Sequence, residues 1–118
     1  MRLEECYDAL GGDLEGTLKR MCNKRLVERF VLRFLSDESF PALAKAMSEE
    51  SYEDAFRAAH SLKGAAANLG FTKLYEASAA LTEALRGGKK PQEDALLLQV
   101  RVEYDRTMEV LRKFQGMT

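Results

Sequence analysis

Apolar residues in the middle of the chain recur at steps of three and four, the spacing of one face of an α-helix. For residues 51–69 this face consists of Tyr52, Phe56, Ala59, Leu62, Ala66 and Leu69. Ser51 and Asp54 form an S-x-x-D helix start, and Gly70 is a typical stop because glycine tolerates the left-handed conformation. A second apolar face follows within a few residues, at Leu74, Ser78, Leu81 and Leu85. The pattern therefore predicts a helical hairpin over residues 51–86.

Capping residues predict shorter helices before this hairpin. Gly11 and Gly12 end a first helix, and Asp13 and Asn23 are of the residue types that begin the next two. The apolar stripe of the third segment is Leu26, Val27, Phe30, Phe34 and Leu35. Ser39 is expected to cap a fourth short helix, which carries a proline in its first turn.

One long helix is predicted after the hairpin. Gly87 and Gly88 close the second arm, and Pro91 is expected to open the last helix. Its apolar positions are Leu97, Val100, Tyr104, Met108, Leu111 and Phe114. We therefore predict an all-α fold in which residues 1–118 form a single domain. The expected architecture is an antiparallel four-helix bundle of the hairpin, the C-terminal helix and an upstream helix, with additional short N-terminal helices on one end.

Charge and hydropathy exclude two classes of partner. The 118 residues include 18 Lys and Arg against 19 Asp and Glu, a formal net charge of -1. This balance lacks the basic surface that nucleic acid requires, so we expect no nucleic-acid partner. No uncharged apolar run approaches the roughly 20 residues of a spanning helix, and the N-terminus has no apolar signal region. We therefore expect a cytoplasmic protein with no membrane partner.

The cysteines and the single histidine do not suggest a metal site. Cys6 and Cys22 have no CxxC spacing, so we expect two reduced thiols rather than a disulfide or a zinc site. A di-iron bundle would need Glu-x-x-His pairs, which one histidine cannot supply.

That histidine, His60, lies in the middle of the predicted first arm, one residue beyond the apolar Ala59, so its side chain should face solvent. Its neighbours on the helix surface are Phe56, Arg57, Lys63, Gly64 and Ala67, of which only Phe56 should point clearly to the core. Gly64 costs the helix roughly 1 kcal/mol relative to alanine, so a compensating role is expected there: the missing Cβ lets another molecule approach the ring.

The imidazole has a nucleophilic nitrogen suited to phosphoryl transfer. The chain has no Walker loop, no nucleotide-binding glycine pattern and no carboxylate cluster for Mg²⁺ near His60, so a partner would have to supply the metal and the acid-base groups. From the residues alone, an ordinary surface histidine remains an open alternative.

The string AHSLKGAAANLG at residues 59–70 resembles the signature of histidine-containing phosphotransfer (Hpt) domains, A-H-x-L-K-G followed by small residues and a glycine. The resemblance extends to Gly12 and Asp13, to the segment around Phe34 and Leu35, and to a later A-x-x-L segment that ends in A-L-R-G-G. It implies a helical bundle that takes a phosphoryl group from the aspartate of a response-regulator receiver domain and passes it on. The implied protein has no kinase activity and no cofactor of its own, with Mg²⁺ held by the receiver.

The resemblance also assigns residues. His60 would be the phosphoacceptor through its outer ring nitrogen, with Lys63 beside the phosphate and Gly64 as the gap that admits the receiver. The full set of implied phosphate neighbours and docking residues is Lys63, Gly64, Arg57, Ala67, Thr82 and Arg86. Many relatives carry Gln or Glu at the position of Thr82, so Glu83 or a water would have to orient the inner ring nitrogen here.

Three functions remain as alternatives. The leading one is a phosphorelay intermediate in two-component signalling whose partners are receiver domains and a hybrid sensor histidine kinase. The second is a bundle that docks on receivers or kinases without carrying phosphate, which the Thr82 substitution motivates. The third is the phosphoacceptor module of a chemotaxis-type kinase. We expect a monomer, because the predicted apolar stripes can satisfy one another within one bundle.

Overall fold

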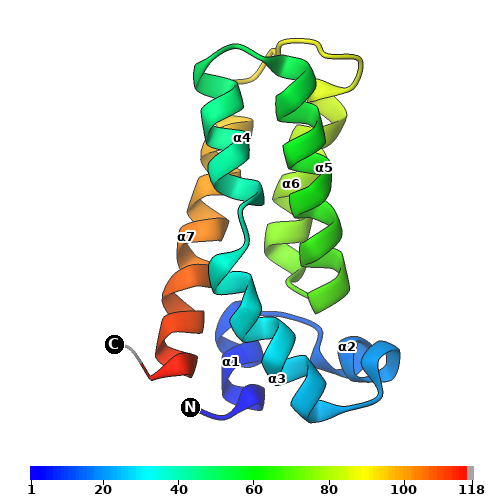
Figure 1. Cartoon of the computed structure of the whole chain (residues 1–118), viewed down its shortest axis with the longest axis vertical. Helices are drawn as coiled ribbons and strands as arrows, with labels where there is room; N and C mark the ends of the chain where they lie inside the picture. The colour runs from blue at the N-terminus through cyan, green and yellow to red at the C-terminus, as the bar shows by residue number, and fades with distance from the viewer. Residues whose placement is uncertain (117–118) are drawn as a thin grey trace.

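The helices of the computed structural model, which describes residues 1–116, stand in two tiers (Figure 1). Their bounds are α1 Leu3–Leu10, α2 Leu14–Met21, α3 Lys24–Arg33, the 3-10 helix η1 Phe34–Ser36, α4 Ser39–Ser48, α5 Tyr52–Leu69, α6 Thr72–Leu85 and α7 Ala95–Gln115. The upper tier is a bundle in which α5 packs on α4 and α6, and α6 packs on α7. Helices α1, α2 and α3 form the lower tier around the end of α7. The predicted all-α bundle with extra N-terminal helices is confirmed.

A chain of aromatic side chains joins the two tiers. Phe71, in the turn between α5 and α6, lies 5.9 Å from the Tyr7 ring of α1 and 5.5 Å from the Phe34 ring of η1. Tyr104 of α7 continues the chain by stacking on Phe40 of α4 at 4.3 Å. Such pairs add directional contacts to the apolar burial of the core. Residues of the N-terminal helices and of the bundle belong to one buried cluster, so the two tiers share a single core.

The turn of the central hairpin is fixed by Gly70, as predicted. Gly70 is left-handed, with φ of 70°, and ends α5 by donating its backbone N–H to the carbonyl oxygens at its C-terminus. A Cβ at this position would collide with the Thr17 hydroxyl and the Asp13 carbonyl. The Asp13 backbone N–H also donates to the Gly70 carbonyl at 2.8 Å. Helix α2 therefore begins directly against the hairpin turn.

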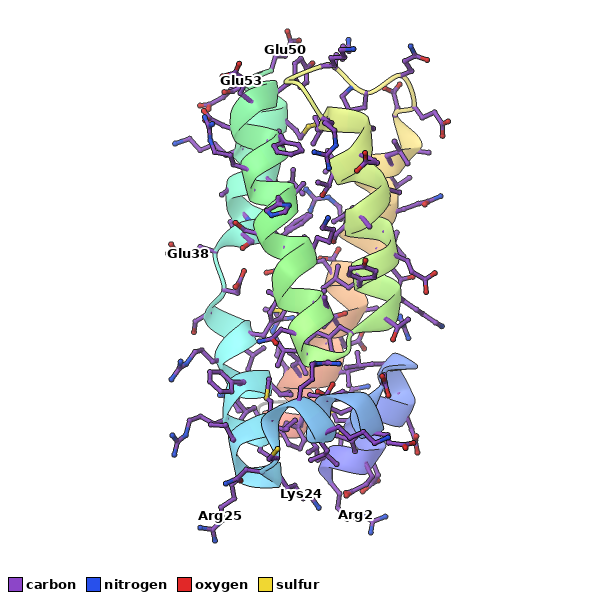
Figure 2. All side chains as sticks on the ribbon, turned by 90° about the vertical axis from the view of Figure 1, so that its right-hand side faces the viewer. Arg2, Lys24, Arg25, Glu38, Glu50 and Glu53 are labelled. Carbon is purple, nitrogen blue, oxygen red and sulfur yellow. The ribbon has the colours of Figure 1, made fainter. Side chains whose placement is uncertain are left out.

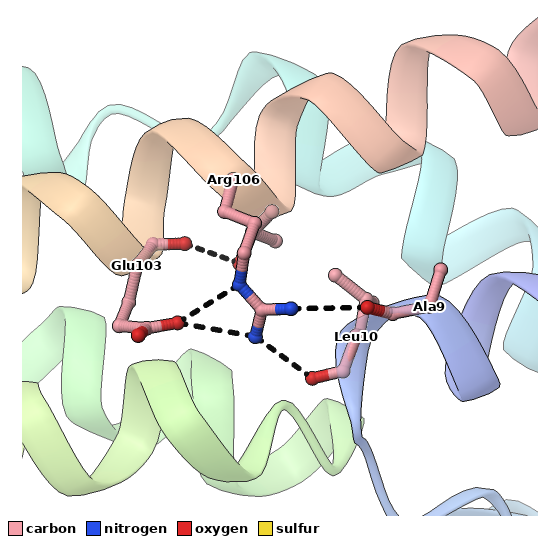
Figure 3. A network of polar contacts seen from close by, with 5 residues as sticks. Ala9, Leu10, Glu103 and Arg106 are labelled. Carbon is pink, nitrogen blue, oxygen red and sulfur yellow. Dashed lines mark hydrogen bonds and ion pairs between the residues drawn. The ribbon is translucent and has the colours of Figure 1, made fainter.

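Two arginines donate hydrogen bonds to carbonyl groups at the C-termini of helices, where backbone donors are few. Arg20 of α2 donates to the carbonyls of Ala67 and Asn68, both at 3.1 Å, at the end of α5. Arg106 of α7 makes two 3.0 Å bonds to carbonyls at the end of α1 and pairs with Glu103 (Figure 3). These contacts attach α2 and α1 to the bundle through charge-assisted hydrogen bonds.

Three predicted helix starts differ in detail. Ser51 is the N-cap of α5, as the S-x-x-D pattern predicted, but its hydroxyl donates to the Asp54 carboxylate at 2.7 Å and does not cap the backbone. Ser39 is the first residue of α4 rather than its cap, because the Asp37 carboxylate accepts its backbone N–H at 2.8 Å. Pro91 is buried in the connection before α7 and does not open that helix. The boundaries at Ser39 and Pro91 therefore differ from the prediction, whereas the one at Ser51 agrees with it.

Both cysteines are free, with Cys6 buried and Cys22 exposed. Burial raises the pKa of the Cys6 thiol from 9.0 to about 11, and it also raises the pKa of the neighbouring Tyr7 phenol, whose hydroxyl donates to the Leu69 carbonyl at 2.6 Å. In both groups burial disfavours the ionised form.

These shifts predict a loss of stability in alkali. Below about pH 9 both groups are protonated in the folded and unfolded states, and the stabilisation is complete. As the pH rises, the unfolded chain loses these protons first, so Cys6 alone should lower the free energy of unfolding by about 2 kcal/mol near pH 11. Denaturant unfolding followed by circular dichroism across this range measures the loss. Cys6→Ala and Tyr7→Phe should each flatten the profile, and a wild-type profile that is flat to pH 11 would contradict the assignment.

Candidate functional site

His60 lies on the outer face of α5, near the middle of the helix. Its side chain is exposed, whereas Ala59 and Leu62 on either side of it are fully buried. Figure 2 shows α5 and α6 side by side on one face of the molecule, with α2 across their lower end. The imidazole therefore projects from a rigid helix whose opposite side is anchored in the core.

The surface beyond His60 is open toward the C-terminal end of α5. A Cβ built on Gly64 would meet no atom within 4 Å apart from the backbone of its own helix. A shallow hollow of about 590 Å³ continues from this point and is lined by Gly64, Ala65, Ala67, Asn68 and Arg20. Apart from Arg20 and Asn68 these residues have little or no side chain. A second protein can therefore come close to the backbone one turn beyond the imidazole.

Phe56 forms the other side of the site, although the sequence pattern placed it in the core. It is only half-buried, and its ring stacks on the His60 imidazole with a centroid distance of 6.1 Å and an interplanar angle of 18°. The Arg86 guanidinium, from the end of α6, lies 5.3 Å from the centre of the same Phe56 ring. Phe56 therefore links the histidine to a cation that is 26 residues away along the chain.

Carboxylates hold two of the cations around His60. The Arg57 guanidinium pairs with Asp54 at 2.8 Å, one turn nearer the start of α5. Arg86 pairs with Glu83 through two hydrogen bonds of 2.9 Å each. The Arg86 guanidinium lowers the pKa of the Glu83 carboxyl, and the charge of Lys63 adds to this effect. Lys63 itself is half-buried and belongs to none of the ion pairs found within residues 1–116.

Thr82 does not belong to the docking surface, which corrects the sequence-based assignment. It is fully buried, and its hydroxyl donates to the Ser78 carbonyl at 2.7 Å. Glu83 does not replace it as a partner of the inner ring nitrogen, because Arg86 occupies its carboxylate. In the part of the chain that the structure describes, no hydrogen bond reaches the His60 side chain, whose ring stacks on Phe56.

Two further properties of residues 1–116 bear on the kind of site. No group of three or more His, Cys, Asp or Glu side chains is placed to hold a metal ion in this part of the chain. None of the helices described combines the length and the hydropathy needed to span a bilayer.

Comparison with known families places the chain in one of them. The sequence model of the Hpt domain matches residues 31–111, which is most of the chain and includes all of α4, α5 and α6. The chain belongs to the Hpt domain family. Hpt domains act in phosphotransfer in two-component signalling, are not kinases, and interact with receiver and kinase domains. No curated protein and no solved structure gives a significant match to the chain.

The matched region of this Hpt domain does not include α1 and α2, which lie before residue 31. Even so, α2 contributes to the surface next to His60, because Arg20 lines the hollow that begins at Gly64. Arg20 was not predicted from the sequence, because it lies 47 residues from the Ala67 carbonyl that it contacts. Glu83 was not predicted as the partner of Arg86 either, although the i,i+3 spacing of a glutamate and an arginine was a usable signal.

Proposed function

We propose that His60 accepts a phosphoryl group from the phosphorylated aspartate of a receiver domain and passes it to another receiver. The observation that carries this proposal is the exposed imidazole on a rigid helix, with open space at Gly64 one turn away. A receiver must bring its acyl phosphate into contact with the ring nitrogen, which requires close approach of two protein surfaces. Open space on one side of the ring supports such an approach.

The proposed step needs only a lone pair from this chain. The outer nitrogen of the neutral imidazole attacks phosphorus, the N–P bond forms, and the P–O bond to the receiver aspartate breaks. The bonding electrons return to the aspartate carboxylate, and the proton on the inner nitrogen leaves to solvent. Transfer to a second receiver is the reverse of this step.

The surrounding cations have supporting roles in this proposal. Lys63 and Arg86 offset the charge of the phosphoryl group, and Arg57 and Ala67 contribute to the docking face with Gly64. The chain supplies no cofactor, and Mg²⁺ is held by the receiver. We also propose that the protein works as a cytoplasmic monomer of one domain, without kinase activity, and exchanges phosphate with receivers, including that of a hybrid sensor histidine kinase.

Phosphotransfer from a labelled receiver tests this function. Incubation with a receiver carrying ³²P on its aspartate should transfer label to this chain, and the label should be acid-labile and stable in base. Peptide mapping by mass spectrometry should place it on His60. If none of the receivers encoded in the same genome transfers label, the proposal is wrong.

A docking role without phosphate is the second candidate, and one observation favours it. The His60 side chain has no hydrogen-bond partner to fix its tautomer within the described residues, because Thr82 is buried and Glu83 is paired. In that case receivers should bind with unchanged affinity to His60→Ala, and no phosphohistidine should form under any condition. Binding that depends on receiver phosphorylation, together with transfer of label, would exclude the docking role.

A further inference from the structure

The Arg86 guanidinium has two partners beside the phosphoacceptor site. Its Nε and Nη2 atoms each donate to the Glu83 carboxylate at 2.9 Å. Its Cζ atom lies 5.3 Å from the centre of the Phe56 ring, which itself stacks on the His60 imidazole. A bidentate carboxylate thus occupies a cation that Phe56 links to the place where a phosphoryl group would be attached.

We propose that Glu83 is an internal competitor for phosphate: it holds Arg86 in the unphosphorylated protein and loses Arg86 to the phosphoryl group once His60 carries one. This inference rests on the proposed function and concerns the regulation of the same site. Glu83 then sets how strongly the protein retains the phosphoryl group, because the free energy of phosphorylating His60 includes the free energy needed to break the Glu83–Arg86 ion pair.

The two anions compete for the same donors. A guanidinium binds carboxylate and phosphate in the same forked geometry. A phosphoryl group carries about -1.5 to -2 charges and three acceptor oxygens, whereas the carboxylate carries one charge and two oxygens. The phosphoryl group is therefore the stronger partner for Arg86 when both are within reach.

The existing ion pair is also easy to exchange. The side chains of Arg86 and Glu83 are 57% and 67% exposed, so water replaces their hydrogen bonds at little cost when the pair opens. Arg86 is the C-cap residue of α6, and the proposal requires its exposed side chain to rotate away from Glu83 and toward His60. Pairing with Arg86, and the charge of Lys63, lower the pKa of the Glu83 carboxyl. The competitor is therefore ionised throughout the neutral pH range.

The experiment is a mutant cycle on the phosphotransfer equilibrium. Wild type, Glu83→Gln, Arg86→Gln and the double variant are each mixed with the same ³²P-labelled receiver, and the ratio of label on this chain to label on the receiver is measured at equilibrium. Glu83→Gln should raise that ratio about two- to fivefold, the range expected from one exposed ion pair. In the Arg86→Gln background the same substitution should have no effect.

A charge control and a direct probe of Arg86 accompany the cycle. Glu109→Gln removes the same charge on α7, where Glu109 pairs with Lys113 at 3.7 Å, and should leave the ratio unchanged. In the wild type, the side-chain Nε–H resonance of Arg86 should shift when the protein is phosphorylated with phosphoramidate, while that of Arg57 should shift less.

The outcomes separate this inference from the function on which it depends. If all variants are labelled but Glu83→Gln shows no gain, the competition is wrong and the phosphotransfer function stands. A gain that persists without Arg86 would show simple repulsion between Glu83 and the phosphate, which also overturns the proposal. If no variant is labelled, the phosphotransfer function itself fails, and the competition fails with it.

Discussion

His60→Gln is expected to abolish phosphorylation of the protein while leaving its fold intact. The amide nitrogen of glutamine is not a nucleophile, because its lone pair is delocalised into the carbonyl, so the substitution removes the only group proposed to bond to phosphorus. The His60 side chain is exposed and stacks on the Phe56 ring. Its replacement should therefore change the free energy of unfolding by less than about 0.5 kcal/mol. Acid-labile label measures the first effect and denaturant unfolding the second.

Ser61→Ala is the matched control for this variant. Ser61 is the next residue on α5, is exposed, and carries the nearest alternative acceptor in sequence. Label should be retained in Ser61→Ala and absent from His60→Gln. Acid-labile label that survives in His60→Gln would show that another residue is the acceptor, and a variant that unfolds would show that the imidazole contributes to the core.

Gly64→Gln is expected to block transfer from a receiver although it stabilises the helix. Glutamine should add about 0.5–1 kcal/mol of stability, because glycine is unfavourable inside a helix and the space around Gly64 is empty. The longer side chain would stand where the receiver must approach. A displacement of the reacting groups by about 1 Å is enough to slow such a step roughly 100-fold. Rapid-quench transfer assays measure the rate.

Two controls separate obstruction of docking from damage to the histidine. Gly64→Ala should gain similar stability with a much smaller loss of rate, because one methyl group adds little bulk. Phosphoramidate, a small donor, should phosphorylate Gly64→Gln and the wild type at similar rates, since it does not need the open surface. Equal receiver transfer rates in the wild type and Gly64→Gln would remove the argument that Gly64 provides access.

The local parts of the fold were predictable from sequence because they depend on neighbouring residues. The apolar spacing of α5, its stop at Gly70 and the caps at Asp13 and Asn23 all involve groups within four residues of one another. Helix geometry converts such spacings directly into one face of a helix. The same reasoning placed Ala59 in the core and left His60 in solvent, as the structure has them.

The position of Thr82 is the part of the site that was predicted wrongly. Thr82 and Glu83 are adjacent in sequence, yet the first is fully buried and the second is exposed and paired with Arg86. Thr82 stands four residues after Ser78 and three before Leu85, which both lie on the predicted apolar face, so the spacing along α6 already indicated its burial. The resemblance assigned Thr82 to the docking face instead, and that prediction was wrong.

By itself, the sequence determined the helical class, most helix ends and the one exposed histidine, since each follows from residues close together in the chain. Only the tertiary structure decided how groups from separate segments meet around that histidine: the Arg86 guanidinium lies against the Phe56 ring, and Arg20 lies at the far end of the hollow. These side chains come from three helices, α2, α5 and α6. Their meeting point depends on how the buried faces of those helices pack together, which is a property of the whole core.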